Sequence, residues 1–166
     1  VAAPVAIIQM GATYIYNPLL GYLVERYHSR EKSFFSLIGK ILAGIFFVGV
    51  ISSVALFFFG KLLLSLFYGA GIAKHTDLLQ PMLACAFLTG IAWFVNDLLV
   101  SLDNYRGVFV GSMLSLISAA AVMAPAQMLF GLNGPTVSAL ISNAICLIYQ
   151  SSVLGKQTQQ WFGEKR

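Results

Sequence analysis

Five long stretches without a charged residue constrain this chain more than any other feature of its sequence. Each has about the 18 residues that an α-helix needs to cross the apolar core of a bilayer. Because lipid offers the backbone no hydrogen-bond partner, such stretches are expected to be helical. The sequence therefore predicts an all-α, polytopic membrane helical bundle with about five transmembrane helices. The five stretches are Val1–Val24, Ile41–Phe59, Leu78–Asn96, Gly107–Phe130 and Leu132–Gly155.

The composition agrees with lipid as the main solvent. Only 10% of the residues are charged, against about 25% in a typical soluble domain. The net charge of +4 does not indicate a nucleic-acid partner, because the basic residues are spread over the polar breaks and gather on no single face. Cys85 and Cys146 lie within apolar stretches, so we interpret them as small hydrophobic residues.

Shorter segments separate or follow the five stretches. Lys61–Tyr68 is apolar but too short to span a bilayer, so we expect a short interfacial helix there. Asp103–Gly107 and Gly131–Pro135 have the composition of tight turns. The expected organisation is a transmembrane bundle over residues 1–155, followed by a polar, cytoplasmic tail over residues 156–166. The start at Val1 without a leader suggests a fragment that lacks its upstream part.

The positive charges predict an orientation. Five crossings place the break at 25–32, the turn at 103–107 and the C-terminal tail on one side, with seven Lys and Arg residues between them. The other side has Lys61 and Lys74. Because cytoplasmic loops carry the excess of Lys and Arg, we expect a multi-pass protein of the cytoplasmic (inner) membrane with its C-terminus in the cytoplasm.

Two charged side chains near the ends of apolar stretches have two interpretations each. Lys40 lies 21 residues before Lys61, and Asp97 lies 20 residues after Asp77. Both separations correspond to about 30 Å of helix, which is the thickness of the hydrocarbon core, so these residues would mark its interfaces. In the functional alternative, Lys40 faces a diphosphate in a cavity and Asp97 binds a proton or a cation.

The first apolar stretch carries a polar stripe. Gln9, Thr13, Tyr16 and Asn17 follow the i, i+4, i+7, i+8 spacing of one helical face. Polar groups that face lipid are costly, so this stripe should face protein or water. It is either the lining of a substrate cavity in a carrier or a set of interhelical hydrogen bonds.

Small residues recur at four-residue spacing in the last two stretches. Such rows let helix backbones approach closely, so we expect them to pack these two helices together. The rows contain Gly107, Gly111 and Ser115 in one stretch, and Ser138 and Ser142 in the other.

No motif indicates catalysis. His28 and His75 lie in breaks on opposite predicted sides and cannot share a metal, and no Cys/His spacing supports one. The chain has no phosphate-binding glycine loop and no nucleophile or paired-carboxylate constellation. We therefore predict neither an enzyme nor a bound cofactor or metal.

Three segments resemble bacterial polysaccharide flippases, a branch of the multidrug/oligosaccharidyl-lipid/polysaccharide exporter superfamily. YNPLLGYLVERYHSREKSFFSLIGKIL (Tyr16–Leu42) is similar to that family's helix, charged loop and Lys before the next helix. KLLLSLFYGAGIAKHTDLLQPML (Lys61–Leu83) is similar to its periplasmic L-L-x-L-x-Y-G element, and FGLNGPTVSALIS (Phe130–Ser142) to the turn before its last helix.

The resemblance implies the last five helices of a twelve-helix carrier, with two bundles around a central cavity and transport by alternating access. The implied cargo is an oligosaccharide linked to undecaprenyl diphosphate, moved from the inner to the outer leaflet. The implied partners are membrane lipids, this lipid-linked oligosaccharide and the N-terminal helices of the full-length carrier. The alternatives are a multidrug or cation exporter of the same superfamily and a membrane-embedded structural subunit. A sugar-polymerising membrane enzyme fits less well, because no large polar loop is present.

Overall fold

The computed structural model describes residues 2–29, 31, 33–68 and 79–163. They form only helices and turns, with no strand in these ranges, so the all-α prediction is confirmed. The elements are α1 (Ala2–His28), α2 (Ser33–Tyr68), α3 (Leu79–Ser101), α4 (Tyr105–Phe130), the short 3-10 helix η3 (Gly131–Asn133) and α5 (Gly134–Gly163).

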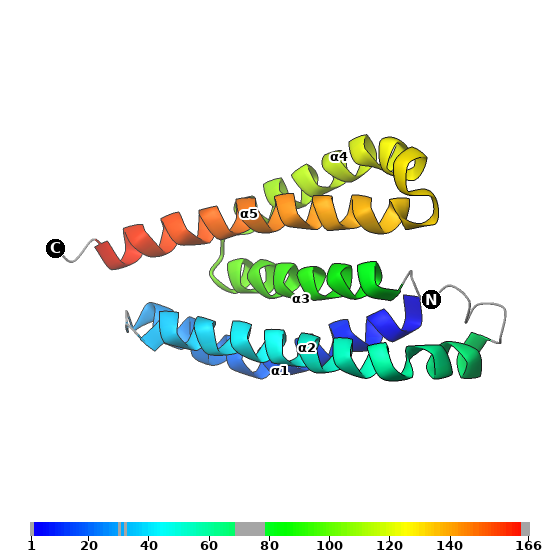
Figure 1. Cartoon of the computed structure of the whole chain (residues 1–166). Helices are drawn as coiled ribbons and strands as arrows, with labels where there is room; N and C mark the ends of the chain where they lie inside the picture. Colours follow the sequence, from blue (N-terminus) through cyan, green and yellow to red (C-terminus); the bar gives the residue numbers. More distant parts are fainter. Residues whose placement is uncertain (1, 30, 32, 69–78, 164–166) are drawn as a thin grey trace.

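The helices form three layers. α3 lies between the pair α1–α2 and the pair α4–α5 (Figure 1), and it contacts helices of both pairs. The end of α1 and the start of α2, the turn between α3 and α4, and the end of α5 lie at one end of the bundle, on the left of Figure 1. The sequence also predicts that these three places share one side of a membrane. Which side of a membrane this end would face stays a prediction.

Three helical stretches of the described residues are long and apolar enough to cross a membrane by length and composition. They are Ser33–Ala55, Pro81–Ser101 and Tyr105–Gly163, of which the last includes both α4 and α5. The helices are therefore compatible with a multi-pass membrane protein. The number of five crossings stays a prediction.

The separate interfacial helix expected at Lys61–Tyr68 is wrong, because α2 continues through this segment to Tyr68. No proline interrupts it, and a glycine such as Gly60 costs only about 1 kcal/mol inside a helix. A lysine at a membrane surface can extend its ammonium toward water without ending the helix. α2 therefore has 36 residues, or about 54 Å of helix, which exceeds the thickness of a bilayer core.

The polar tail predicted from residue 156 onward is not separated from α5 by a helix end. α5 continues through Lys156 to Gly163. Thr158 on this extension is buried, and Trp161 is half-buried against α1. Packing on α1 thus extends the helix into a polar sequence.

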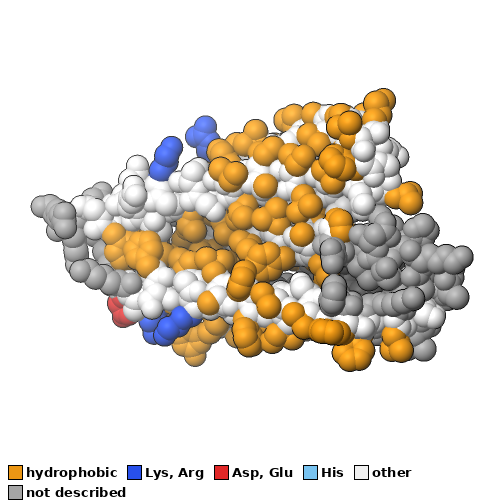
Figure 2. Space-filling view, viewed as in Figure 1, with side chains coloured by type: hydrophobic (Ala, Val, Ile, Leu, Met, Phe, Trp, Pro, Cys, Tyr) orange, Lys and Arg blue, Asp and Glu red, His pale blue; other side chains and the backbone are white. Residues whose placement is uncertain are grey.

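Apolar side chains cover much of the outer surface. Phe58 is 72% exposed and Met128 is 87% exposed, while Gln150 is fully buried. Figure 2 shows hydrophobic side chains spread over the middle of the visible face, with Lys and Arg side chains toward one end. Exposed apolar surface of this extent is unusual for a soluble protein, and it is compatible with lipid around the bundle.

Candidate functional site

Three amide side chains of α5 hydrogen-bond α3 or the turn that follows it, and we call these contacts the polar ladder. Asn143 Nδ2 donates to Thr89 Oγ1 at 2.8 Å. Gln150 Nε2 donates to Asn96 Oδ1 at 3.0 Å. At the end of α3, Gln157 Nε2 donates to the Leu102 carbonyl at 3.1 Å and Gln157 Oε1 accepts from Asn104 Nδ2 at 2.7 Å.

The rungs of the polar ladder have a regular spacing. Asn143, Gln150 and Gln157 are seven residues apart, which is about 10.5 Å along a helix. α3 and α5 run in the same direction (Figure 1), and the first two rungs join residues 54 positions apart. A seven-residue repeat keeps side chains on one seam between two helices. This repeat was not predicted from the sequence, although the seven-residue spacing of the three amides can be read there.

Gln150 occupies the most enclosed rung. It has no exposed surface, and its Oε1 has no hydrogen-bond partner among the described residues. Gly111 of α4 makes room for it, because a Cβ at Gly111 would lie 2.8 Å from Gln150 Cγ. The absence of a side chain on α4 thus allows a large amide to lie between α3 and α5.

A second polar contact joins α3 to α1. The hydroxyl of Tyr16, which is 1% exposed, donates to Asp97 Oδ2 at 2.8 Å. Thr13 also hydrogen-bonds the Tyr16 side chain, and the Tyr16 ring packs edge-on against Phe94, with centroids 5.4 Å apart. Asp97 follows Asn96 in sequence, so two consecutive side chains of α3 connect it to α1 and to α5.

The predicted polar stripe of α1 divides between two environments. Tyr16 faces α3 and Thr13 hydrogen-bonds Tyr16 within α1, but Asn17 is exposed. The side chain of Gln9 lies outside the described part of the chain. One residue turns an α-helix by about 100°, so Asn17 belongs to a neighbouring face. That face exposes polar and aromatic groups together, and we call it the outer face of α1: Tyr14, Asn17, Tyr22 and Glu25.

The remaining predicted residues lie at the surface or between α4 and α5. Lys40 is exposed on α2. Ser138 Oγ of α5 donates to the Ala119 carbonyl of α4 at 3.0 Å, and a Cβ at Gly107 would meet Val153 of α5 at 2.9 Å. Ser115 is half-buried, and Ser142 is buried and donates within its own helix to the Ala139 carbonyl.

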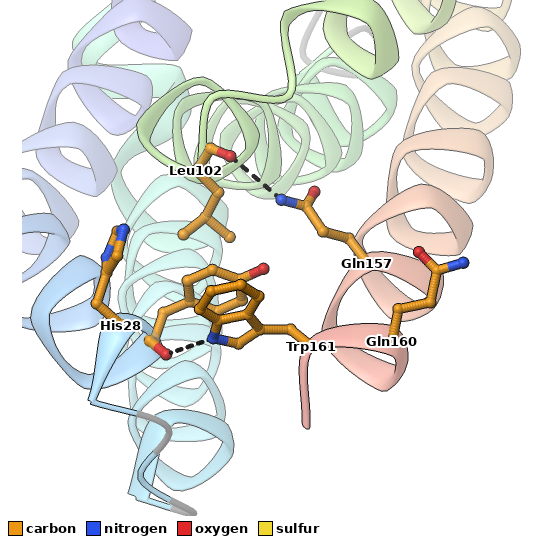
Figure 3. A pocket seen from close by; sticks show the side chains of 6 residues that line it. His28, Leu102, Gln157, Gln160 and Trp161 are labelled. Carbon is orange, nitrogen blue, oxygen red and sulfur yellow. Dashed lines mark hydrogen bonds between the residues drawn. The ribbon is translucent and has the colours of Figure 1, made fainter. Parts of the chain in front are cut away.

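An open cleft of about 470 Å³ lies where α1, α3 and α5 end (Figure 3). Trp161 Nε1 donates to the Tyr27 carbonyl at 3.0 Å, and the rings of these two residues stack with centroids 5.5 Å apart. We call it the end cleft; its walls are Tyr27, His28, Leu102, Gln157, Gln160 and Trp161.

Within the described ranges, no group of three or more His, Cys, Asp or Glu residues is placed to hold a metal ion. His75 lies outside these ranges. Comparisons with protein-family models, with curated proteins and with solved structures found no match.

Proposed function

We propose that this chain is part of a membrane transporter that carries lipid-linked oligosaccharide across the cytoplasmic membrane by alternating access. The sequence resemblance to polysaccharide flippases suggests the cargo. Consecutive helices of the bundle run in opposite directions, as they would in part of a membrane transporter.

The outer face of α1 is the observation that carries the proposal. Asn17 and Tyr22 are exposed in the middle and the second half of α1, a 27-residue helix that is not among the three stretches apolar enough to span a membrane, and Glu25 is exposed near its end. An amide without a hydrogen-bond partner in an apolar medium costs about 1–3 kcal/mol by mutational measures. In a membrane this face therefore requires water or another polar surface, as the wall of a substrate cavity would provide.

The polar interior supports the same function. Alternating access moves one group of helices against another as a nearly rigid body. The polar ladder fixes α5 to α3, and the Tyr16–Asp97 hydrogen bond fixes α1 to α3. These contacts would keep the outer face of α1 in a constant position while the body moves.

Inactivating the gene tests the cargo. Lipid-linked oligosaccharide should accumulate in the cytoplasmic leaflet, and surface glycan should fall. The wild-type gene should restore transport, whereas Asn17→Leu should restore less of it. Ser112→Leu is the matched control, because Ser112 is an exposed polar residue on α4. Normal surface glycan in the inactivated strain would contradict the proposal.

A cation or drug exporter is the second candidate, and Asp97 favours it. Its carboxylate is half-buried inside the bundle and its contact there is the Tyr16 hydroxyl. Ionisable side chains within membrane bundles commonly mark ion pathways. An efflux assay with a toxic organic cation separates the two candidates, because resistance that is lost with Asp97→Asn, while surface glycan stays normal, would favour the exporter.

A further inference from the structure

We propose that the end cleft binds a neutral hexose, either as a free saccharide or as the headgroup of a glycolipid. The inference concerns binding at equilibrium and does not depend on transport. The cleft has a volume of about 470 Å³, within the range of about 300–1,000 Å³ that is usual for small-ligand sites.

Part of the cleft wall is already fixed by hydrogen bonds within the protein. Gln157 bonds both the Leu102 carbonyl and the Asn104 amide, and Trp161 bonds the Tyr27 carbonyl. These contacts hold the ends of α1, α3 and α5 together. A ligand would therefore meet a formed site and would not have to order it, which favours affinity.

Other polar groups of the cleft remain available. The Gln160 amide and the Tyr27 hydroxyl form no hydrogen bond with another described residue. His28 Nδ1 bonds the Val24 carbonyl at 2.9 Å, so Nε2 is free to act as an acceptor in the neutral ring. Figure 3 shows His28 on one side of the cleft and Gln160 on the other, with Trp161 between them.

The chemistry of the wall selects the ligand. None of the six described wall residues is Asp, Glu, Lys or Arg, so no permanently charged side chain among them pairs with a carboxylate, a phosphate or an amine. Phosphate recognition typically uses Arg or Lys. A hexose ring instead has apolar C–H faces, which would pack on the exposed part of Trp161, and hydroxyls that donate to and accept from amide, imidazole and phenol groups.

Intrinsic fluorescence offers a direct test. The chain has two tryptophans, so Trp93→Phe leaves Trp161 as the sole reporter. The purified full chain, in nanodiscs of neutral phospholipid, is titrated with methyl hexosides and, separately, prepared with a monohexosyl diacylglycerol. We expect a saturable change in Trp161 emission in at least one of these two arms, and the responding arm identifies the source of the sugar. Gln160→Ala should weaken binding about five- to tenfold.

Gln159→Ala is the matched control. Gln159 is an exposed glutamine of the same helix and is not part of the cleft wall, so its variant should bind like the parent. Three results would overturn the inference: no saturable change in either arm, a response to phosphatidylglycerol without a response to sugar, or equal losses in the Gln159 and Gln160 variants. Saccharide binding without transport would refute the proposed function and leave this inference standing. Transport without saccharide binding would refute this inference and leave the proposed function standing.

Discussion

The Tyr16 hydroxyl donates a 2.8 Å hydrogen bond to Asp97 Oδ2 and so joins α1 to α3 across 81 positions of sequence. Tyr16 is buried, and Asp97 lies one residue after the Asn96 rung of the polar ladder. Two consecutive residues of α3 thus hydrogen-bond different neighbours, Asp97 to α1 and Asn96 to α5.

Tyr16→Phe should destabilise the bundle by about 1 kcal/mol, because it removes this hydrogen bond and leaves a carboxylate without its partner. Unfolding in mixed micelles measures the change. Tyr14→Phe is the control, since Tyr14 is 81% exposed and its hydroxyl should contribute little. Equal stability of the two variants would show that the Tyr16–Asp97 contact does not hold α1 on α3.

Gly111→Ala should destabilise the contact of α4 with α5 by about 1–3 kcal/mol, the usual cost of overpacking. The new methyl group would lie 2.8 Å from Gln150 Cγ in a site without free space. Gly155→Ala has open space, so it should be neutral or should stabilise α5 by up to about 1 kcal/mol. Thermal unfolding in detergent compares the two, and a stabilised Gly111 variant would contradict the packing described.

Trp161→Phe should loosen the end of α5 from α1. It removes the bond from Nε1 to the Tyr27 carbonyl, worth about 1 kcal/mol, so exchange of nearby amide hydrogens should accelerate about fivefold. Hydrogen exchange over residues 24–28 and 157–163 measures this effect. Trp93→Phe on α3, whose side chain is 46% exposed, should leave exchange in both segments unchanged. Unaltered exchange in the Trp161 variant would mean that the α5 extension is not held by this contact.

The positions of the helices were largely predictable, because an uncharged stretch of bilayer-spanning length has few alternatives to a helix. The predicted stretch Gly107–Phe130 corresponds closely to α4 at Tyr105–Phe130. The turn expected from Gly131 onward begins with the 3-10 helix η3 at that residue. Helix ends were less predictable. Lys61 did not end α2, because a lysine can reach water from inside a helix.

The candidate site was less predictable than the helices. Tyr16 and Asp97 were both singled out as polar residues in apolar stretches, but nothing in the sequence paired them, since which faces meet depends on how the helices pack. The polar ladder was missed although Asn143 and Gln150 stand seven residues apart. The end cleft was not predictable, because it requires α5 to extend past Lys156 as a helix that packs on α1.

The central claim is that the bundle lies in a membrane with the α1–α2 break, the α3–α4 turn and the end of α5 on one side. Single cysteines at Ser29, Asp103, Gly163 and Leu132, introduced after Cys85 and Cys146 are replaced by Ala, test it by labelling with a membrane-impermeant maleimide. All four positions are exposed. We predict that Leu132→Cys is labelled from outside the cell, and that the other three are labelled only in inverted vesicles. Labelling of Ser29→Cys and Gly163→Cys from opposite sides, or recovery of the chain in the aqueous fraction without detergent, would contradict the account.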